Sequence, residues 1–280
     1  HREAHHRGMN LTRPALLAVL LTGCATLPLA PIHPFVPPPP ATTPIEVCWL
    51  ETAGTEGWGG FAAAGHARTE TWEATASVLL VRHPKGDVLI DTGSAQHPEE
   101  ELAELGGYGR WLFRETAGRM VLRGDLIELL AAAGVEKPTA VILSHSHADH
   151  AGGVTQLPGV KVWVGPPEQA FIELGVRKES SVVMPAQARA LAAQLEPIPF
   201  ARAPYETFDE SFDVFGDGAV VVVPTYGHTP GSVSTFIAID QRRLLHVGDL
   251  VSSQESLERN VPKSFPMRML TDEDRGAVGE

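Results

Sequence analysis

The stretch Thr139-Ala-Val-Ile-Leu-Ser-His-Ser-His-Ala-Asp-His150 carries the strongest structural signal in this sequence. Its apolar run from Ala140 to Leu143 is typical of a short buried strand. A loop that contains three histidines and one aspartate follows directly. Residues two apart in an extended segment point to the same side. His145 and His147 can therefore direct two imidazole rings at one point just beyond the strand.

The next two polar residues, Asp149 and His150, lie where the chain must turn, because Ala151-Gly152-Gly153 offers little side-chain hindrance. They can address a second point close to the first. Imidazole and carboxylate groups suit zinc and its neighbours as ligands. The alternative, a loop of histidines without a ligand, accounts for one histidine better than for three beside a carboxylate. The stretch therefore predicts a metal site.

Three further motifs accompany this loop along the chain. Leu89-Ile-Asp-Thr-Gly93 precedes it, and Gly227-His-Thr-Pro-Gly-Ser232 and Val247-Gly-Asp249 follow it. With His145-Ser-His-Ala-Asp-His150, in this order and at these separations, they resemble the metallo-β-lactamase-fold hydrolases over about residues 75–253. The resemblance implies an α/β protein with the four-layer αββα sandwich of that family, in its branch of lactonases and glyoxalase-II-like enzymes.

The resemblance also implies up to two bound metal ions, expected to be zinc. The first ion would be bound by His145, His147 and His228. The second would be bound by Asp149 and His150, and Asp249 would bridge the two ions. Asp149 is also expected to be catalytic, as a proton shuttle. Asp91, at the end of its predicted strand, is expected to orient the ligands.

One departure from the family pattern concerns the second ion. Family members usually supply a further histidine beyond the bridging aspartate, whereas no histidine follows His246 in this sequence. The tail from Thr271 to Glu280 is typical of the start of an acidic helix. We therefore expect a C-terminally incomplete domain whose second metal site lacks one ligand. His246 is expected to lie in the core or to support the ligands.

The reaction that the resemblance implies is hydrolysis of an ester, lactone or thioester bond in a small acyl substrate by a metal-bound hydroxide. Zinc β-lactamases have cysteine at the position of Asp249, which argues against penicillins. Acyl-homoserine lactonases are similar in length and spacing, but they have a tyrosine at the position of Ser252, and Tyr226 is not equivalent to it. A non-catalytic metal-binding surface lipoprotein is the alternative, because the second site lacks a ligand.

The segment Asp91-Thr-Gly-Ser94 also matches the signature of an aspartic protease. Such enzymes need two carboxylates that share a proton. No second Asp-Thr-Gly or Asp-Ser-Gly occurs in the chain. A dimer would supply one, but this interpretation leaves the histidine cluster unexplained.

The composition favours one large globular domain. The chain has 280 residues, of which 43% are hydrophobic and 20% charged, and this is enough for a substantial core. Its net charge of −12 argues against a nucleic-acid partner, whose phosphates require a basic surface. The two cysteines, Cys24 and Cys48, do not suggest a disulfide scaffold, and Cys48 is expected in the core.

The N-terminal part divides into three segments. Residues 1–8 are expected to be an upstream extension, and residues 9–24 resemble a bacterial lipoprotein signal whose lipobox ends at Cys24, the expected lipidation site. Residues 25–44 are rich in proline and predict an extended linker. The domain at 45–280 would then be exported and held at the bacterial cell envelope by a lipid anchor, at the outer membrane if the cell is Gram-negative.

Runs of apolar residues and turn residues predict the secondary structure of this domain. We expect a glycine-rich loop at 54–65, and Trp111 and Phe113 in the core. Strands are expected at 45–50, 76–81, 87–90, 140–143, 161–164, 219–223, 232–239 and 243–247, and helices at 125–133, 166–174 and 185–195.

Overall fold

The computed structural model describes residues 34–65, 70–115, 120–180, 182–274 and 276–279. The expected upstream extension, the signal segment with Cys24 and the first part of the linker lie outside these residues. Within the described ranges, none of the helices combines the length and apolarity needed to cross a membrane.

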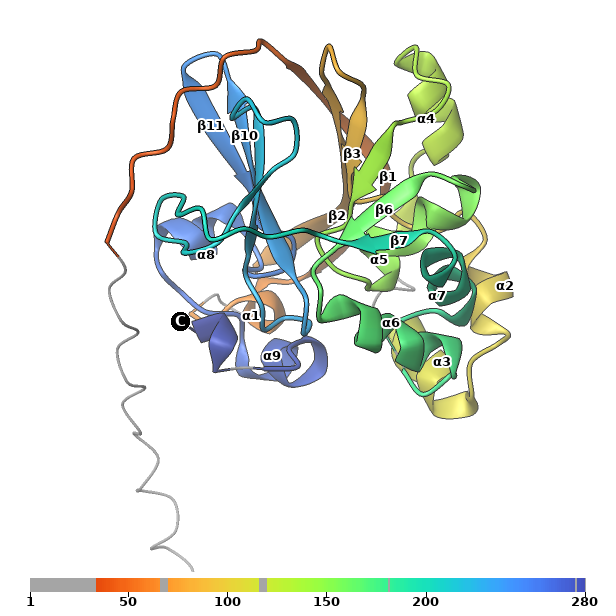
Figure 1. The fold of residues 1–280 in the computed structure, drawn as a ribbon. Helices are drawn as coiled ribbons and strands as arrows, with labels where there is room; N and C mark the ends of the chain where they lie inside the picture. The colour runs from red at the N-terminus through yellow and green to blue at the C-terminus, as the bar shows by residue number, and fades with distance from the viewer. Residues whose placement is uncertain (1–33, 66–69, 116–119, 181, 275, 280) are drawn as a thin grey trace, which may run out of the picture. The chain divides into compact units, whose positions relative to one another are not determined.

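Two β-sheets form the framework of the domain (Figure 1). The larger sheet has the strand order β4-β1-β2-β3-β5-β6-β7, and the smaller sheet has the order β11-β10-β9-β8. The strands are β1 Glu46–Trp58, β2 Thr71–Arg82, β3 Val88–Ile90, β4 Val121–Leu122, β5 Ala140–Ile142, β6 Lys161–Val164, β7 Leu195–Pro197, β8 Phe212–Asp213, β9 Val220–Pro224, β10 Val233–Ile239 and β11 Arg242–His246.

Helices cover the larger sheet on its side away from the smaller sheet, where α4, α6 and α7 lie in Figure 1. This arrangement confirms the prediction of an α/β fold with two sheets. The helices are α1 Gly59–Ala62, α2 Pro98–Leu102, α3 Gly107–Glu115, α4 Leu126–Ala132, α5 Ala148–Ala151, α6 Glu168–Val176, α7 Pro185–Ala192, α8 Gln254–Glu258 and α9 Phe265–Thr271, with 3-10 turns η2 Gly152–Gln156 and η3 Ala277–Gly279.

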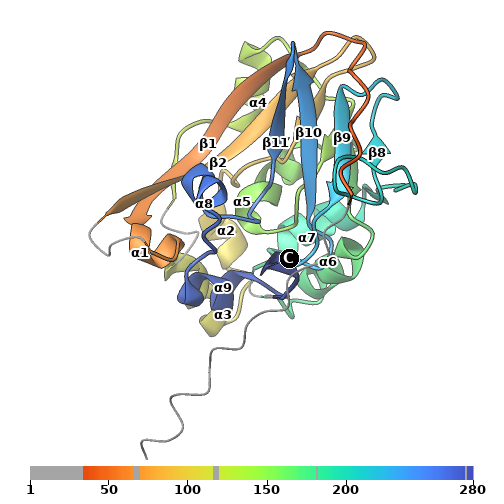
Figure 2. The same cartoon turned by 90° about the vertical axis from the view of Figure 1, so that its left-hand side faces the viewer.

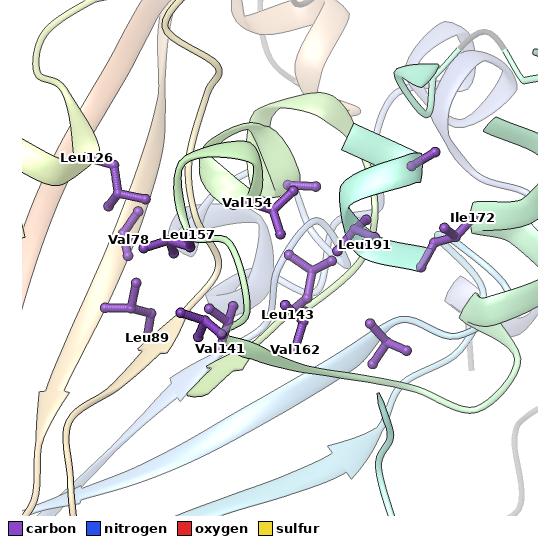
Figure 3. Packing of buried hydrophobic residues seen from close by; sticks show 14 of the residues in the cluster. Val78, Leu89, Leu126, Val141, Leu143, Val154, Leu157, Val162, Ile172 and Leu191 are labelled. Atoms are coloured by element: carbon purple, nitrogen blue, oxygen red, sulfur yellow. The ribbon is translucent and has the colours of Figure 1, made fainter. Parts of the chain in front are cut away.

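The larger sheet has an apolar core on each face. Along β2, Val78 and Leu80 join the core beneath the helices, whereas Leu79 and Val81 join the core between the two sheets. Successive residues of a strand point to opposite faces, so a strand buried on both faces is apolar without interruption. Figure 3 shows the core beneath the helices, where Val78 lies near Leu126.

The topology brings the ends of several strands to one edge of the framework. Strands β3 and β5 are parallel and pair Ile90 with Ile142, so the chain leaves both strands on the same side. Strands β9 and β11 both run antiparallel to β10, so they also end together. The segments that follow β5, β9 and β11 contain the predicted metal ligands, and Asp91 follows β3.

Most predicted elements are present, and α4 shows why. Asp125 caps its N-terminus by accepting hydrogen bonds from the backbone N–H groups of Ile127 and Glu128. Gly134 follows with a positive φ of 74°, as expected for the residue after a helix end. Local signals of this kind can be read from the sequence.

Three expectations were wrong. The segment at 54–65 is not a loop. The strand β1 continues as far as Trp58, because residues 54–58 pair with residues 71–75 of β2, as Figure 2 also shows, and α1 follows. Trp111 is 56% exposed; the side chain of Phe113 lies outside the described part. The tail does not begin a helix at Thr271, because α9 ends there and Asp272 is extended.

Candidate metal centre

Three histidines converge at the common edge of the two sheets. The Nε2 atom of His228 lies 3.2 Å from Nε2 of His145 and 3.0 Å from Nδ1 of His147. Ligands bound 2.0–2.1 Å from a tetrahedral zinc ion would lie about 3.3–3.4 Å apart. The spacing of the three donor atoms therefore fits a single zinc ion.

The local chain geometry produces this convergence. The loop after β5 stays extended, so the side chains of His145 and His147 point to the same side. His228 comes from the loop after β9, and the backbone N–H of Val233 donates to the Ser144 carbonyl at 2.9 Å to join the two loops. Gly227, which precedes His228, has a φ of 137°, a conformation that favours glycine.

The three-histidine group is buried, and the rings of His145 and His147 favour the neutral state that binds a metal. Burial lowers the pKa of His145 and of His147 well below the usual value, and the neighbouring histidine rings lower it further. Neutral imidazoles have a free lone pair for a cation. His147 directs Nδ1 at the group although its Nε2 is then left buried without a hydrogen-bond partner, an orientation that a shared cation explains.

A second group lies beside the first and contains His150, Asp149 and Asp249. The Nε2 atom of His150 is 3.1 Å from Asp249 Oδ1 and 3.9 Å from Asp149 Oδ2. The other oxygen of Asp249, Oδ2, lies 3.7 Å from His228 Nε2. Asp249 thus directs one oxygen at each group, as a bridging carboxylate would.

The approach of Asp249 depends on the preceding glycine. Gly248 has a φ of 54°, and a Cβ atom at this position would lie 2.9 Å from the Oγ of Ser144. A larger residue would push the loop after β11 away from the loop after β5. The separation of the two groups would then increase.

Carboxylates govern the charge of the second group. Burial alone would lower the pKa of His150, but Asp249, Asp91 and Asp149 together hold it well above the usual value. Burial acts to raise the pKa of Asp249, yet His150 outweighs it and holds that pKa well below the usual range. Burial raises the pKa of Asp149. The group offers anionic oxygens that attract a divalent cation.

Asp91 fixes the orientation of His150. It is fully buried, with a φ of 61°, and it accepts hydrogen bonds from Ser144 N at 2.6 Å, from Ser144 Oγ at 2.8 Å and from His150 Nδ1 at 2.8 Å. Because the bond with Asp91 holds a proton on Nδ1, Nε2 faces Asp249 and is the ring atom that would bind a metal ion after losing its own proton. His246 Nε2 lies 3.6 Å from Asp91 Oδ2. A carboxylate so enclosed cannot reach a peptide substrate, which argues against the aspartic-protease interpretation.

An aspartate from the tail, which belongs to none of the sequence motifs, supports His228. Asp272 Oδ1 lies 2.9 Å from Nδ1 of His228, and the buried Lys263 contacts both of them. The Nδ1 atom of His228 cannot both donate to Asp272 and accept from Lys263. We therefore assign the Nδ1 proton to the bond with Asp272 and pair the ammonium group of Lys263 with the Asp272 carboxylate. The Nε2 lone pair of His228 then points at the three-histidine group.

The structure brings all six predicted ligand residues into one cluster. Two sets within it have donor atoms that lie within 4.8 Å of one another: His145, His147 and His228, and His145, His150 and Asp249. Among the described residues, no further histidine joins the second set. Sequence reasoning missed Asp272, Lys263 and the buried Glu168, which contacts both histidine loops.

Comparisons with known proteins identify the family of the chain. The family model of the metallo-beta-lactamase superfamily matches residues 71–280. No curated protein matches the sequence.

Several solved structures share the fold at low identity. An N-acyl homoserine lactone hydrolase, with N-hexanoyl-L-homoserine bound at its catalytic metal center, is 18% identical with a TM-score of 0.61, over 85% of this chain and 85% of that chain. A B. thuringiensis AiiA variant with N-decanoyl-L-homoserine at the active site gives the same values. The dizinc quorum-quenching lactonase AidC is 18% identical with a TM-score of 0.53, over 89% of this chain and 84% of that chain.

The family match covers most of the chain, and the residues of the four sequence motifs meet in one cluster whose donor atoms fit a metal. Both findings support a metal-dependent hydrolase. The chain belongs to the metallo-beta-lactamase superfamily.

Proposed function

We propose that this protein is a zinc-dependent hydrolase that cleaves an ester, lactone or thioester bond in a small acyl substrate. The observation that carries the proposal is the convergence of three buried histidines beside a carboxylate that also faces His150. A bound pair of divalent ions supplies Lewis acidity and lowers the pKa of a water ligand toward about 7.

The side chains of this chain divide the remaining work. His145, His147 and His228 would hold the first ion, and His150 with Asp149 the second. Asp249, which has one oxygen toward each group, would hold the two ions at a fixed separation. Preorganised ligands of this kind need no rearrangement during the reaction.

Asp149 would also move a proton. Its side chain is 24% exposed, so it borders both the histidine cluster and the solvent side where a substrate enters. A carboxylate at such a position can accept a proton from the attacking water and deliver it to the leaving oxygen or sulfur.

The substrate class is inferred from the fold neighbours and from one local difference. One neighbour holds an acyl-homoserine product at its catalytic metal center, and the dizinc lactonase AidC is in complex with such a product, which favours a lactone or a related ester. At the position of the lactonase tyrosine, the hydroxyl of Ser252 donates to the carbonyl of Ala62 at 2.7 Å. This hydroxyl is therefore engaged in the fold, and we do not assign it the role of the tyrosine.

A single set of measurements tests this proposal. The purified protein is analysed for bound zinc and then assayed on a panel of lactones, esters and thioesters, with and without a chelator. Bound zinc together with turnover that the chelator abolishes supports the hydrolase. Bound zinc without turnover on any member of the panel contradicts it and favours the non-catalytic metal-binding lipoprotein.

We also propose that Cys24 carries a lipid that anchors the protein at the bacterial cell envelope. The support is the apolar signal pattern of residues 9–24 that ends in Leu-Thr-Gly-Cys, followed by the proline-rich segment at 25–44. An extended linker of this composition would hold the domain away from the membrane surface.

A further inference from the structure

Behind the histidine cluster lies a buried carboxylate that the mechanism does not use. Glu168 is the first residue of α6 and is 1% exposed. Its Oε1 accepts hydrogen bonds from Ser146 N at 2.8 Å and Ser146 Oγ at 2.6 Å. Its Oε2 accepts from Thr229 Oγ1 at 2.7 Å and Gly231 N at 2.9 Å.

The partners of Glu168 are the immediate neighbours of the metal-binding histidines. Ser146 lies between His145 and His147, and in an extended segment its side chain points away from theirs. Thr229 directly follows His228. The carboxylate therefore contacts both histidine loops on the side away from the metal site. Ser146 and Thr229, whose hydroxyls it binds, are adjacent in sequence to the metal-binding histidines.

The two loops cannot separate without disrupting this contact. A buried carboxylate is unfavourable unless its oxygens are hydrogen-bonded, and the two oxygens of an ionised carboxylate offer about four lone-pair sites. The two loops supply four donors to Glu168, so its charge is compensated only while both loops are in place.

A close backbone approach makes the contact specific. A Cβ atom on Gly231 would lie 2.3 Å from the backbone nitrogen of Glu168. Only glycine allows the loop after β9 to approach the start of α6 this closely. The position of His228 is thereby tied to α6 through two separate features, the carboxylate and the glycine.

We propose that Glu168 is a positioning residue that holds the two histidine loops together and so sets the affinity of the three-histidine group for its metal ion. The inference rests on the proposed function, because it requires these histidines to bind a metal. It predicts an effect on the first ion only, since the ring of His150 is held by Asp91 instead.

Glu168→Gln tests the inference with almost no change in size. The amide has one acceptor oxygen, so its NH2 group must face either the donors of Ser146 or those of Thr229 and Gly231. Opposed donors push one loop away from the carboxamide. We expect zinc binding at the first site to weaken by about 10–100-fold, as is typical when a group that orients a metal ligand is lost.

The measurement is a titration of the metal-free protein with Zn²⁺ in competition with a chromophoric chelator, with urea unfolding of the metal-free form in parallel. Glu101→Gln is the matched control, because Glu101 is a partly buried glutamate on α2 that accepts from Gln187 and not from either histidine loop. A general loss of stability would weaken both zinc sites, whereas loss of positioning weakens the first and leaves the second.

A second pair of variants decides the matter if Glu168→Gln does not fold. Thr229→Val removes one of the four donors at constant shape, and Thr229→Ser keeps the hydroxyl. Weaker first-site binding in the valine variant, with binding retained in the serine variant, supports the inference.

Wild-type zinc affinity in both Glu168→Gln and Thr229→Val overturns the inference and leaves the proposed function intact. A wild-type protein that binds no zinc overturns both. The two failures are therefore distinguishable from the wild-type titration alone.

Discussion

Replacing Asp91 by asparagine isolates the hydrogen bond that orients His150. Asparagine has the same size and tolerates the left-handed φ of 61° at this position, so the backbone can persist. Asp91 accepts from Ser144 N at 2.6 Å through Oδ1, and from His150 Nδ1 at 2.8 Å through Oδ2. In Asp91→Asn the amide oxygen remains with the backbone N–H, and the NH2 group then faces the histidine ring.

Two opposed N–H groups cannot remain in contact. His150 can keep its position only if its proton moves from Nδ1 to Nε2, and Nε2 then has no lone pair for a metal ion. Loss of such a supporting partner typically weakens metal binding by about 10–100-fold, which corresponds to about 1.4–2.7 kcal/mol. The metal-free protein should also lose the contribution of one charge-assisted hydrogen bond, about 1.5–3 kcal/mol.

The assay is the chelator competition titration, in which the second zinc ion should bind more weakly and the first as in the wild type. Asp217→Asn is the matched control. Asp217 Oδ2 also bonds a buried histidine, His83 Nε2, at 2.9 Å, but it precedes β9 whereas His228 follows that strand. The control should lose stability without losing zinc. Two zinc ions bound to Asp91→Asn with wild-type affinity would refute this account of His150.

Three further predictions concern catalysis, pH and location. Asp149→Asn should lower turnover by about 10²–10⁴-fold while most of the bound metal is retained, and unchanged turnover would exclude a role in proton transfer. Burial raises the pKa of Glu101 from 4.5 to about 7, so the protonated carboxyl stabilises the wild type fully below pH 4.5, and this contribution is lost as the pH rises through 7. The free energy of unfolding of Glu101→Gln in urea should therefore equal that of the wild type at pH 4 and exceed it at pH 8 by up to about 3 kcal/mol. Equal stability of the two proteins at pH 8 would contradict the shift. Cys24→Ser should move the protein from the detergent phase to the aqueous phase in a detergent partition of cells that express it, whereas an unchanged distribution would count against the lipid anchor.

The sequence alone identified the fold class and the residues that form the cluster. The reason is that these features have local signatures. A buried strand is apolar over several consecutive residues, a helix start has a capping residue such as Asp125, and metal ligands of a loop lie at short, fixed spacings. The run that ends in His145-Ser-His-Ala-Asp-His150 contains both a strand and a ligand pattern within one short segment.

Only the tertiary structure decided how that cluster is held. Glu168 and Asp272 stand in no motif, and their roles depend on contacts with Ser146, Thr229 and His228, which are distant from them in sequence. The strand β1 continues past its apolar part because β2 supplies partners for all of its residues except Thr52, which no local propensity indicates. Burial and hydrogen-bond pairing arise when distant segments meet, so the groups that depend on them become visible only once the chain is folded.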